Sequence, residues 1–349
     1  MTTTPTIRPI TDPQRWAWLG LARFVLASIV AATHLAGFVK SPSLNLVGSA
    51  AFEAILGFLA ISGFSIAHSY HSRPDGYFKR RVLRIYPVFA ASFVASIIVF
   101  YYAENISYSL LAILANIVFL NGFITPVSIV WGSWTLAVEV WLYCLAPFLA
   151  RQSYQRINTF VWLSFLVYCA YTCGRTLFHW PYFSNSNWGI GFICLAFCWM
   201  AGWNLRTAPE KLQLKAKRTL AWLFAGVIVL RFGIGIASQL KNHTLSQGWL
   251  EHTSQVIWAA IVLALVLKLL LTQRLPELTK PVKTAFTFLG NISYPLYLIH
   301  LTVFTGIHRA LGDNPLVLVS SALAASAVLY FVFDWYSQKR ERPLARTNA

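Results

Sequence analysis

Long runs of apolar residues alternate along this chain with short segments that carry most of its charged residues. Ten of these runs are close to the roughly 20 residues that a helix needs to cross the hydrocarbon core of a membrane. They cover residues 16–38, 45–70, 82–103, 132–150, 157–175, 186–204, 219–238, 250–271, 283–306 and 314–336. The pattern therefore predicts an all-α, polytopic bundle of about ten spanning helices.

Composition excludes a water-soluble globule of this length. Only 11% of the 349 residues are charged, whereas an average soluble domain has about 25%. The 14 Trp, 15 Tyr and 25 Phe suit the aromatic belts that membrane proteins form at both interfaces. We expect one integral membrane domain over residues 1–349, with short cytoplasmic tails at 1–15 and 337–349.

One further apolar stretch, residues 109–123, has only about 15 residues and falls short of a span. If it stays on one side, nearly all Lys and Arg in the loops face the same side of the membrane. The exceptions are Lys40, Arg175, Lys241 and Arg309. The positive-inside rule then places both termini in the cytoplasm, and we expect residues 109–123 to form a re-entrant or surface helix on the non-cytoplasmic side.

The formal net charge of the chain is +17. In a soluble protein that charge would suggest nucleic acid, but here the basic residues lie in short loops beside apolar runs. We therefore predict no nucleic-acid partner and expect membrane lipids with anionic headgroups instead. The five Cys lie within apolar runs without His or acid at metal-ligand spacing. We expect them to pack as small apolar residues and predict no metal site.

A few ionisable residues fall inside the predicted spans, where they cost several kcal/mol and are functional candidates by default. Arg23 and His34 lie on nearly the same face of the first span, about 16 Å apart along the helix. Three further groups fall at a depth similar to that of His34, namely Glu53, Glu139 and His300. Four acid or base groups at one depth on four helices predict a catalytic site near the non-cytoplasmic surface.

The third span begins with a basic segment that gives its cytoplasmic end a different character. Arg81 and Arg84 are three residues apart and share a helix face, and their planar guanidinium groups suit phosphate. Together with Arg23 they predict a site for an anionic donor such as acetyl-CoA, whose flexible arm is about 15–20 Å long. A neutral His beside a carboxylate is suited to deprotonate a sugar hydroxyl, and we expect Glu139 or Glu53 to hold His34 for this role.

A series of motifs follows this arrangement along the chain. They are Arg-x10-His at Arg23 and His34, FLAISGF at 58–64, KRRVLRIYP at 79–87, WGSWTLAVEVWLY at 131–143, SYPLYLIH at 293–300 and ERP at 341–343. In kind and in order they resemble the motifs of the membrane acyltransferase-3 family, and the resemblance extends over nearly the whole chain.

The resemblance implies a membrane-embedded enzyme that O-acylates carbohydrates or related acceptors outside the cytoplasm, usually with acetyl-CoA as the donor. It implies that His34 is the catalytic residue and that Arg23, Arg81 and Arg84 are essential. We expect no permanently bound cofactor and a location in the bacterial cytoplasmic (inner) membrane. The acceptor stays open among surface polysaccharide, lipopolysaccharide and small glycosides, and the acyl group is expected to be acetyl.

Two functions from other classes compete with this one. A multi-span transporter or flippase of a lipid-linked or anionic solute would also place charges inside the bundle, although the chain shows no pair of matching interrupted helices. A structural membrane subunit would leave the layer of four groups unexplained. Direct transfer and a route through an acyl-histidine are both compatible with the sequence, and Arg231, also inside a span, has no assigned role. Ser62 with Gly63, and the Tyr-rich stretch 293–297, are expected to allow close packing of helices.

Overall fold

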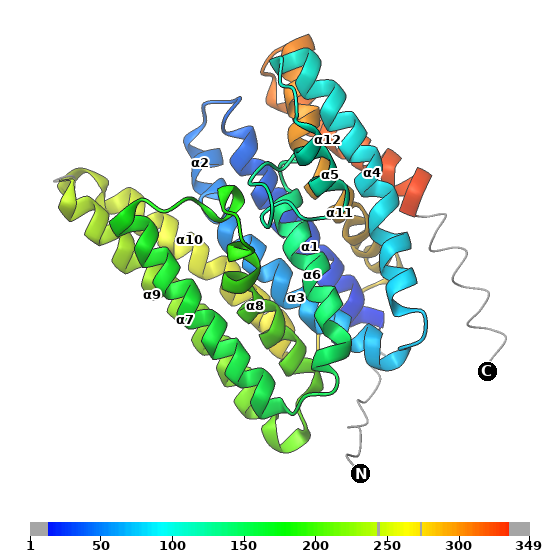
Figure 1. Cartoon of the computed structure of the whole chain (residues 1–349), viewed down its shortest axis with the longest axis vertical. Coiled ribbons are helices and arrows are strands. Elements are labelled where there is room, and N and C mark those ends of the chain that lie inside the picture. The colour runs from blue at the N-terminus through cyan, green and yellow to red at the C-terminus, as the bar shows by residue number, and fades with distance from the viewer. Residues whose placement is uncertain (1–12, 243–244, 273, 335–349) are drawn as a thin grey trace.

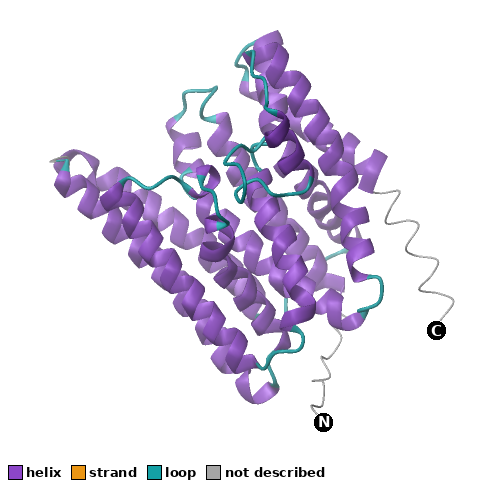
Figure 2. Ribbon diagram, in the orientation of Figure 1, coloured by secondary structure: helices purple, strands orange, loops and turns teal. Residues whose placement is uncertain are grey.

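The structure of the chain is a computed structural model, and it describes residues 13–242, 245–272 and 274–334. Over these residues it is built from helices, and the one pairing of extended backbone is an isolated bridge between Asn121 and Thr125. Figure 2 shows the helices running side by side with short connections at both ends. The predicted all-α fold class is therefore confirmed.

Figure 1 shows the described helices coloured in their order along the chain. They are α1 (Pro13–Leu35), α2 (Pro42–Gly48), α3 (Ala51–Ser72), α4 (Tyr77–Glu104), α5 (Leu110–Ile117), α6 (Ser133–Leu149), α7 (Tyr154–Phe178), η1 (Phe183–Asn185), α8 (Ile190–Thr207), η2 (Glu210–Leu212), α9 (Gln213–Lys241), α10 (Leu245–Leu271), α11 (Lys280–Leu311), α12 (Pro315–Leu329) and η3 (Tyr330–Asp334). In Figure 1 α1, α3, α6 and α11 lie in the middle, with α7, α9 and α10 on one side and α4 and α12 on the other.

Within the described residues, seven helical segments are long and apolar enough to cross a membrane. They are Pro13–Leu35, Pro42–Ser72, Tyr77–Glu104, Tyr154–Phe178, Glu210–Lys241, Gly248–Leu271 and Pro315–Phe333. Large apolar side chains such as Ile98 on α4, Leu166 on α7 and Val229 on α9 are exposed on the outside of the bundle, as lipid-facing residues are. The chain is an integral membrane protein.

Each of the ten predicted spans overlaps a helix, but three of those helices are not among the seven. Helix α6 has only 17 residues, and neither α8 nor α11 is among the helices with an 18-residue stretch apolar enough to qualify. Helix α11 is less apolar because it carries polar residues such as Asn291 and His300. The number ten and the cytoplasmic location of the termini stay predictions. Apart from residues 13–15, the predicted tails lie outside the described residues, as does the ERP motif.

The short apolar stretch at 109–123 forms α5, a helix of 8 residues that is too short to span. Loops and turns then lead to α6. The amide of Asn116, at the end of α5, ties this connection down: its Nδ2 donates to the carbonyl of Val127 at 2.8 Å, and its Oδ1 accepts from the N–H of Ile129 at 3.1 Å. The side of the membrane on which α5 lies stays a prediction.

Glycines allow the central helices to approach closely. A Cβ on Gly63 of α3 would stand 1.9 Å from the carbonyl oxygen of Trp199 on α8, so no larger residue fits there. Helices α1 and α11 meet in the same way, because a Cβ on Gly290 would lie 2.5 Å from the Cα of Gly20. These contacts fix α1, α3 and α11, which carry most of the candidate site residues.

Candidate active site

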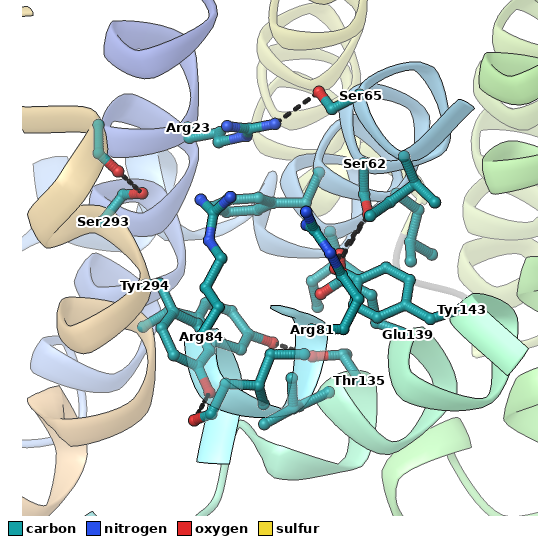
Figure 3. Close-up of a pocket in the computed structure, with 18 of the residues that line it drawn as sticks. Arg23, Ser62, Ser65, Arg81, Arg84, Thr135, Glu139, Tyr143, Ser293 and Tyr294 are labelled. Atoms are coloured by element: carbon teal, nitrogen blue, oxygen red, sulfur yellow. Dashed lines mark hydrogen bonds between the residues drawn. The ribbon is translucent and has the colours of Figure 1, made fainter. Parts of the chain in front are cut away.

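A cavity in the middle of the bundle gathers the three arginines that the sequence predicted as donor-binding residues. Arg23 comes from α1, and Arg81 and Arg84 come from α4. Figure 3 shows their guanidinium groups pointing into the same space. Arg23 donates a hydrogen bond to Ser65 Oγ at 2.6 Å, and Arg81 donates to Ser69 Oγ at 3.0 Å. We call this space the arginine cavity.

The arginine cavity has an excess of positive charge. Within the described residues, none of Arg23, Arg81 and Arg84 forms an ion pair within 4.0 Å of a carboxylate. Among the described residues that line the cavity, Glu139 is the one carboxylate. Arg23 and Arg81 are half-buried, and Arg84 is exposed at the cavity. Partly buried cations without paired acids cost free energy, and a bound anion offsets that cost. Guanidinium groups hold phosphate oxygens in particular, through charge-assisted hydrogen bonds.

Glu139 on α6 belongs to this cavity. Its Oε1 accepts hydrogen bonds from the hydroxyl of Ser62 and, at 2.5 Å, from the hydroxyl of Tyr143 (Figure 3). The indole N–H of Trp199 donates in turn to Ser62 Oγ at 3.3 Å. Glu139 is therefore held by a buried network on α3, α6 and α8.

Two histidines meet at the C-terminal end of α1. The ring centroids of His34 and His300 are 5.1 Å apart. His300 is 1% exposed, and its Nδ1–H donates to the carbonyl of Leu296 at 2.9 Å, which leaves Nε2 buried without a partner in the described residues. His34 is partly exposed and makes no hydrogen bond within the described chain. We call these two residues the histidine pair.

Glu53 belongs neither to the arginine cavity nor to the histidine pair. Its carboxylate forms an ion pair with Arg231 of α9, with 2.5 Å between Oε2 and Nη1. Arg231 also donates to the carbonyl of Ser49 at 2.9 Å. Arg231, which had no assigned role, is thus the partner that compensates the charge of Glu53, and Glu53 is 2% exposed.

The predicted layer of four groups is consequently divided among three places. His34 and His300 are brought together, whereas Glu139 faces the arginines and Glu53 faces Arg231. We expected Glu139 or Glu53 to hold His34, but neither carboxylate lies within hydrogen-bonding distance of it in the structure. The prediction failed at this point because the rise along a helix gives the depth of a residue but does not say which neighbouring helix its side chain faces.

Tyr297 on α11 lies between the arginine cavity and the histidine pair. Its side chain lines the cavity, its ring centroid is 6.4 Å from that of His300, and its hydroxyl makes a hydrogen bond of 2.5 Å with Thr135 Oγ1. Sequence reasoning expected the Tyr-rich stretch around it to serve close helix packing alone. The available signal was its spacing, because Tyr297 stands three residues before His300 and so shares a helix face with it.

Tyr143 and Ser62 were also missed as partners of Glu139. Tyr143 follows Glu139 by four residues, which places both on one face of α6. Ser62 precedes Gly63, and both were expected to serve close packing of helices, a role that Gly63 fulfils. No three His, Cys, Asp or Glu side chains of the described residues gather closely enough to hold a metal ion.

Comparison with known proteins agrees with the motifs. The model of the family described as "Acyltransferase domain" (acyltransferase-3) matches residues 16–335. The chain is also similar to a protein of Acidianus two-tailed virus named "Putative acetyltransferase ORF330", with 26% identity over 234 residues. That match covers 64% of this chain and 64% of the relative, so the chain spans slightly less than two thirds of the length of the relative. No solved structure matches the chain.

Proposed function

The chain belongs to the acyltransferase-3 family, and on that premise we propose that this membrane acyltransferase moves an acetyl group from acetyl-CoA to a sugar hydroxyl. The donor enters the arginine cavity from the cytoplasm, and the acceptor approaches the histidine pair from the other side of the cytoplasmic membrane. The acceptor is a surface polysaccharide or a smaller glycoside.

The observation that carries this proposal is that three arginines share one cavity and that no described residue pairs with them as an acid. An acyl-CoA has phosphates at one end and a thioester at the other, joined by an arm of about 15–20 Å. Arg23 and His34 are separated by about 16 Å along α1. A donor whose phosphates lie against Arg81 and Arg84 can therefore bring its thioester to the level of His34.

The histidine pair supplies the base. The fixed Nδ1–H of His300 makes its Nε2 an acceptor, so it can receive an N–H of His34 and leave the other nitrogen of His34 free to accept a proton. His34 takes the proton of the acceptor hydroxyl, whose oxygen then attacks the thioester carbonyl carbon. The C–S bond breaks, and the proton on His34 passes to the departing thiolate. His34 acts as general base and then as general acid, and His300 positions it.

Glu139 has a different role from the one that its depth suggested. It lies close enough to Arg23 to interact with it electrostatically and accepts hydrogen bonds from Ser62 and Tyr143. We propose that it holds the arginine cavity in shape and limits its positive charge. The cavity is then cationic enough for an anion and is not closed by an internal ion pair.

The test is acetyl transfer by the full-length chain in membranes that contain acceptor, with radiolabelled acetyl-CoA. We expect label in base-labile carbohydrate with the wild type and a loss of about 10² to 10⁴ in rate for His34→Ala. His252→Ala is the matched control, because His252 lies on α10 and contacts Phe232 instead of the site. Full transfer by His34→Ala would refute the catalytic role, and an equal loss in both variants would indicate damage to the bundle. A transporter would move its solute without consuming acetyl-CoA.

A further inference from the structure

Among the described aromatic residues whose rings lie against His34 or His300, Trp131 is the most exposed. It is 55% exposed, whereas Ile129 and Val130 before it and Ser133 after it are fully buried. A mobile loop would expose its neighbours as well. The position of Trp131 therefore reflects a fixed backbone that directs one indole outward.

Two contacts fix that backbone. The N–H of Ile129 donates to Asn116 Oδ1 at 3.1 Å. Gly132, directly after Trp131, lies so close to Tyr297 that a Cβ on it would stand 2.9 Å from the ring and 3.0 Å from the carbonyl oxygen. Because Tyr297 precedes His300 by one helical turn, the loop that carries Trp131 is held against the same part of α11 that carries the histidine.

The indole of Trp131 stands at a right angle to the imidazole of His34. Their ring centroids are 6.1 Å apart, and the angle between the ring planes is 86°. Both side chains are at least partly exposed. They form two walls of a corner, one an aromatic surface and the other the proposed base.

This corner matches the two-sided chemistry of a pyranose ring. Such a ring has C–H bonds on its faces and hydroxyl groups around its edge. Polarised C–H bonds are attracted to the negative face of an indole, so a ring that stacks on Trp131 directs its edge hydroxyls sideways. A flexible polyol chain has no such face.

We infer that Trp131 is the acceptor platform of the enzyme, which stacks on a pyranose ring and presents one of its hydroxyls to His34. The inference rests on the proposed function and adds the class of acceptor to it. Trp131 thereby selects ring-form sugars over open-chain polyols and does not take part in donor binding.

Other exposed tryptophans show what a purely interfacial role looks like. Trp188, in the turn before α8, is 86% exposed and makes no ring contact with His34 in the described chain. Tryptophans of this kind are common where a membrane protein meets the lipid headgroups. Trp188 is therefore the matched control for Trp131.

The experiment uses the full-length chain purified in detergent, where donor and acceptor reach both sides. Methyl pyranosides of glucose, galactose and mannose serve as acceptor probes, glycerol serves as the open-chain probe, and CoA release is measured at varied donor and acceptor concentrations. For the pyranoside that the wild type prefers, we expect Trp131→Ala to raise the acceptor KM about tenfold, which corresponds to about 1.4 kcal/mol of lost binding. The donor KM should stay within about twofold, and Trp131→Phe should retain most of the binding.

Four results would contradict the inference. An unchanged acceptor KM in Trp131→Ala, or an equal rise in Trp188→Ala, would overturn the platform while leaving the acyltransferase intact. A preference of the wild type for glycerol over every pyranoside would overturn it as well. If the wild type releases no CoA with any acceptor, the proposed function itself fails and the inference fails with it.

Discussion

The bundle holds buried charge in two contrasting ways. Glu53 and Arg231 form a closed pair, in which each charge has its partner within 2.5 Å. Arg23, Arg81 and Arg84 share a cavity in which none of them has a paired acid in the described chain. A closed pair satisfies its own charges and leaves little for a ligand to do. A cationic cavity can be stabilised by an anion from outside.

His300 of the histidine pair shows the same contrast between its two ring nitrogens. The Nδ1 of His300 is satisfied by the carbonyl of Leu296, whereas its Nε2 is buried without a partner among the described residues. A buried polar atom without a partner costs about 1–3 kcal/mol. The arginines of the cavity and Nε2 of His300 are therefore the groups that the proposed substrates would satisfy, whereas Glu53 and Arg231 satisfy each other.

Disruption of the pair of Glu53 and Arg231 should cause the largest loss of stability, with little change in substrate binding. Replacement of Glu53 by Leu leaves the charge of Arg231 without compensation. Removal of one partner of a buried pair costs about 3–5 kcal/mol, and we expect about 2–3 kcal/mol because the side chain of Arg231 is 22% exposed. Thermal unfolding in detergent measures the loss, and the donor KM of the folded fraction should stay within about twofold.

A second variant sharpens this result. Glu53→Leu combined with Arg231→Leu removes both charges, so the double variant should be more stable than the sum of the single losses predicts. If Glu53→Leu instead raised the donor KM without lowering stability, the pair would belong to the site and the contrast between closed and unpaired charge would be lost.

Substitutions in the arginine cavity should have the reverse effect, weakening donor binding without lowering stability. Arg81→Met with Arg84→Met removes two donors to phosphate, and we expect the donor KM to rise about a hundredfold, since a hydrogen bond to a charged group contributes about 1.5–3 kcal/mol. Stability should not fall, because clustered cations without paired acids are removed. Steady-state kinetics with varied acetyl-CoA measures the effect.

Arg80 provides the control for that measurement. It stands beside Arg81 in the sequence, but it does not line the arginine cavity, and its guanidinium donates to the carbonyls of Arg73 and Asp75. Arg80→Met should therefore leave the donor KM unchanged. If it weakened the donor as much as the double variant does, the general basic charge of this end of α4 would explain the effect and the cavity would not.

His300 should have a smaller effect than the arginines, and on kcat instead of the donor KM. His300→Leu removes the Nε2 acceptor that orients His34, and we expect kcat to fall about tenfold, as for one lost buried hydrogen bond of about 1.4 kcal/mol. His300→Gln keeps an acceptor oxygen near the position of Nε2 and should recover much of the activity. Equal kcat values for the two variants would mean that shape matters there and the acceptor does not.

The fold was within reach of the sequence because the length of apolar runs and the pattern of basic loops both follow from the membrane itself. Residues 109–123 were separated from the spans by their length and by the charge of the loops, and they contain the short helix α5. The three arginines were grouped correctly because helix periodicity and the chemistry of phosphate point to the same residues. Glu139 and Glu53 were predicted to lie beside His34, but Glu139 bonds to Ser62 and Tyr143, and Glu53 pairs with Arg231. Their partners depend on how the helices around α3 pack against it. Close contacts such as that of Gly63 on α3 with Trp199 on α8 are part of that packing, and depth arithmetic does not contain them.

The smallest effect is expected at Tyr297, which separates the arginine cavity from the histidine pair. Tyr297→Phe keeps the ring and removes the hydroxyl that bonds to Thr135. Thr135 Oγ1 also donates to the carbonyl of Gly132 at 3.0 Å, so it retains a partner. We expect a loss of about 1 kcal/mol in stability and about threefold or less in kcat, with a similar result for Thr135→Val, which removes the same bond from the other side. A hundredfold fall in kcat for Tyr297→Phe alone would show that its hydroxyl carries a proton between the two regions, and the arginine cavity and the histidine pair would then have to be treated as one continuous site.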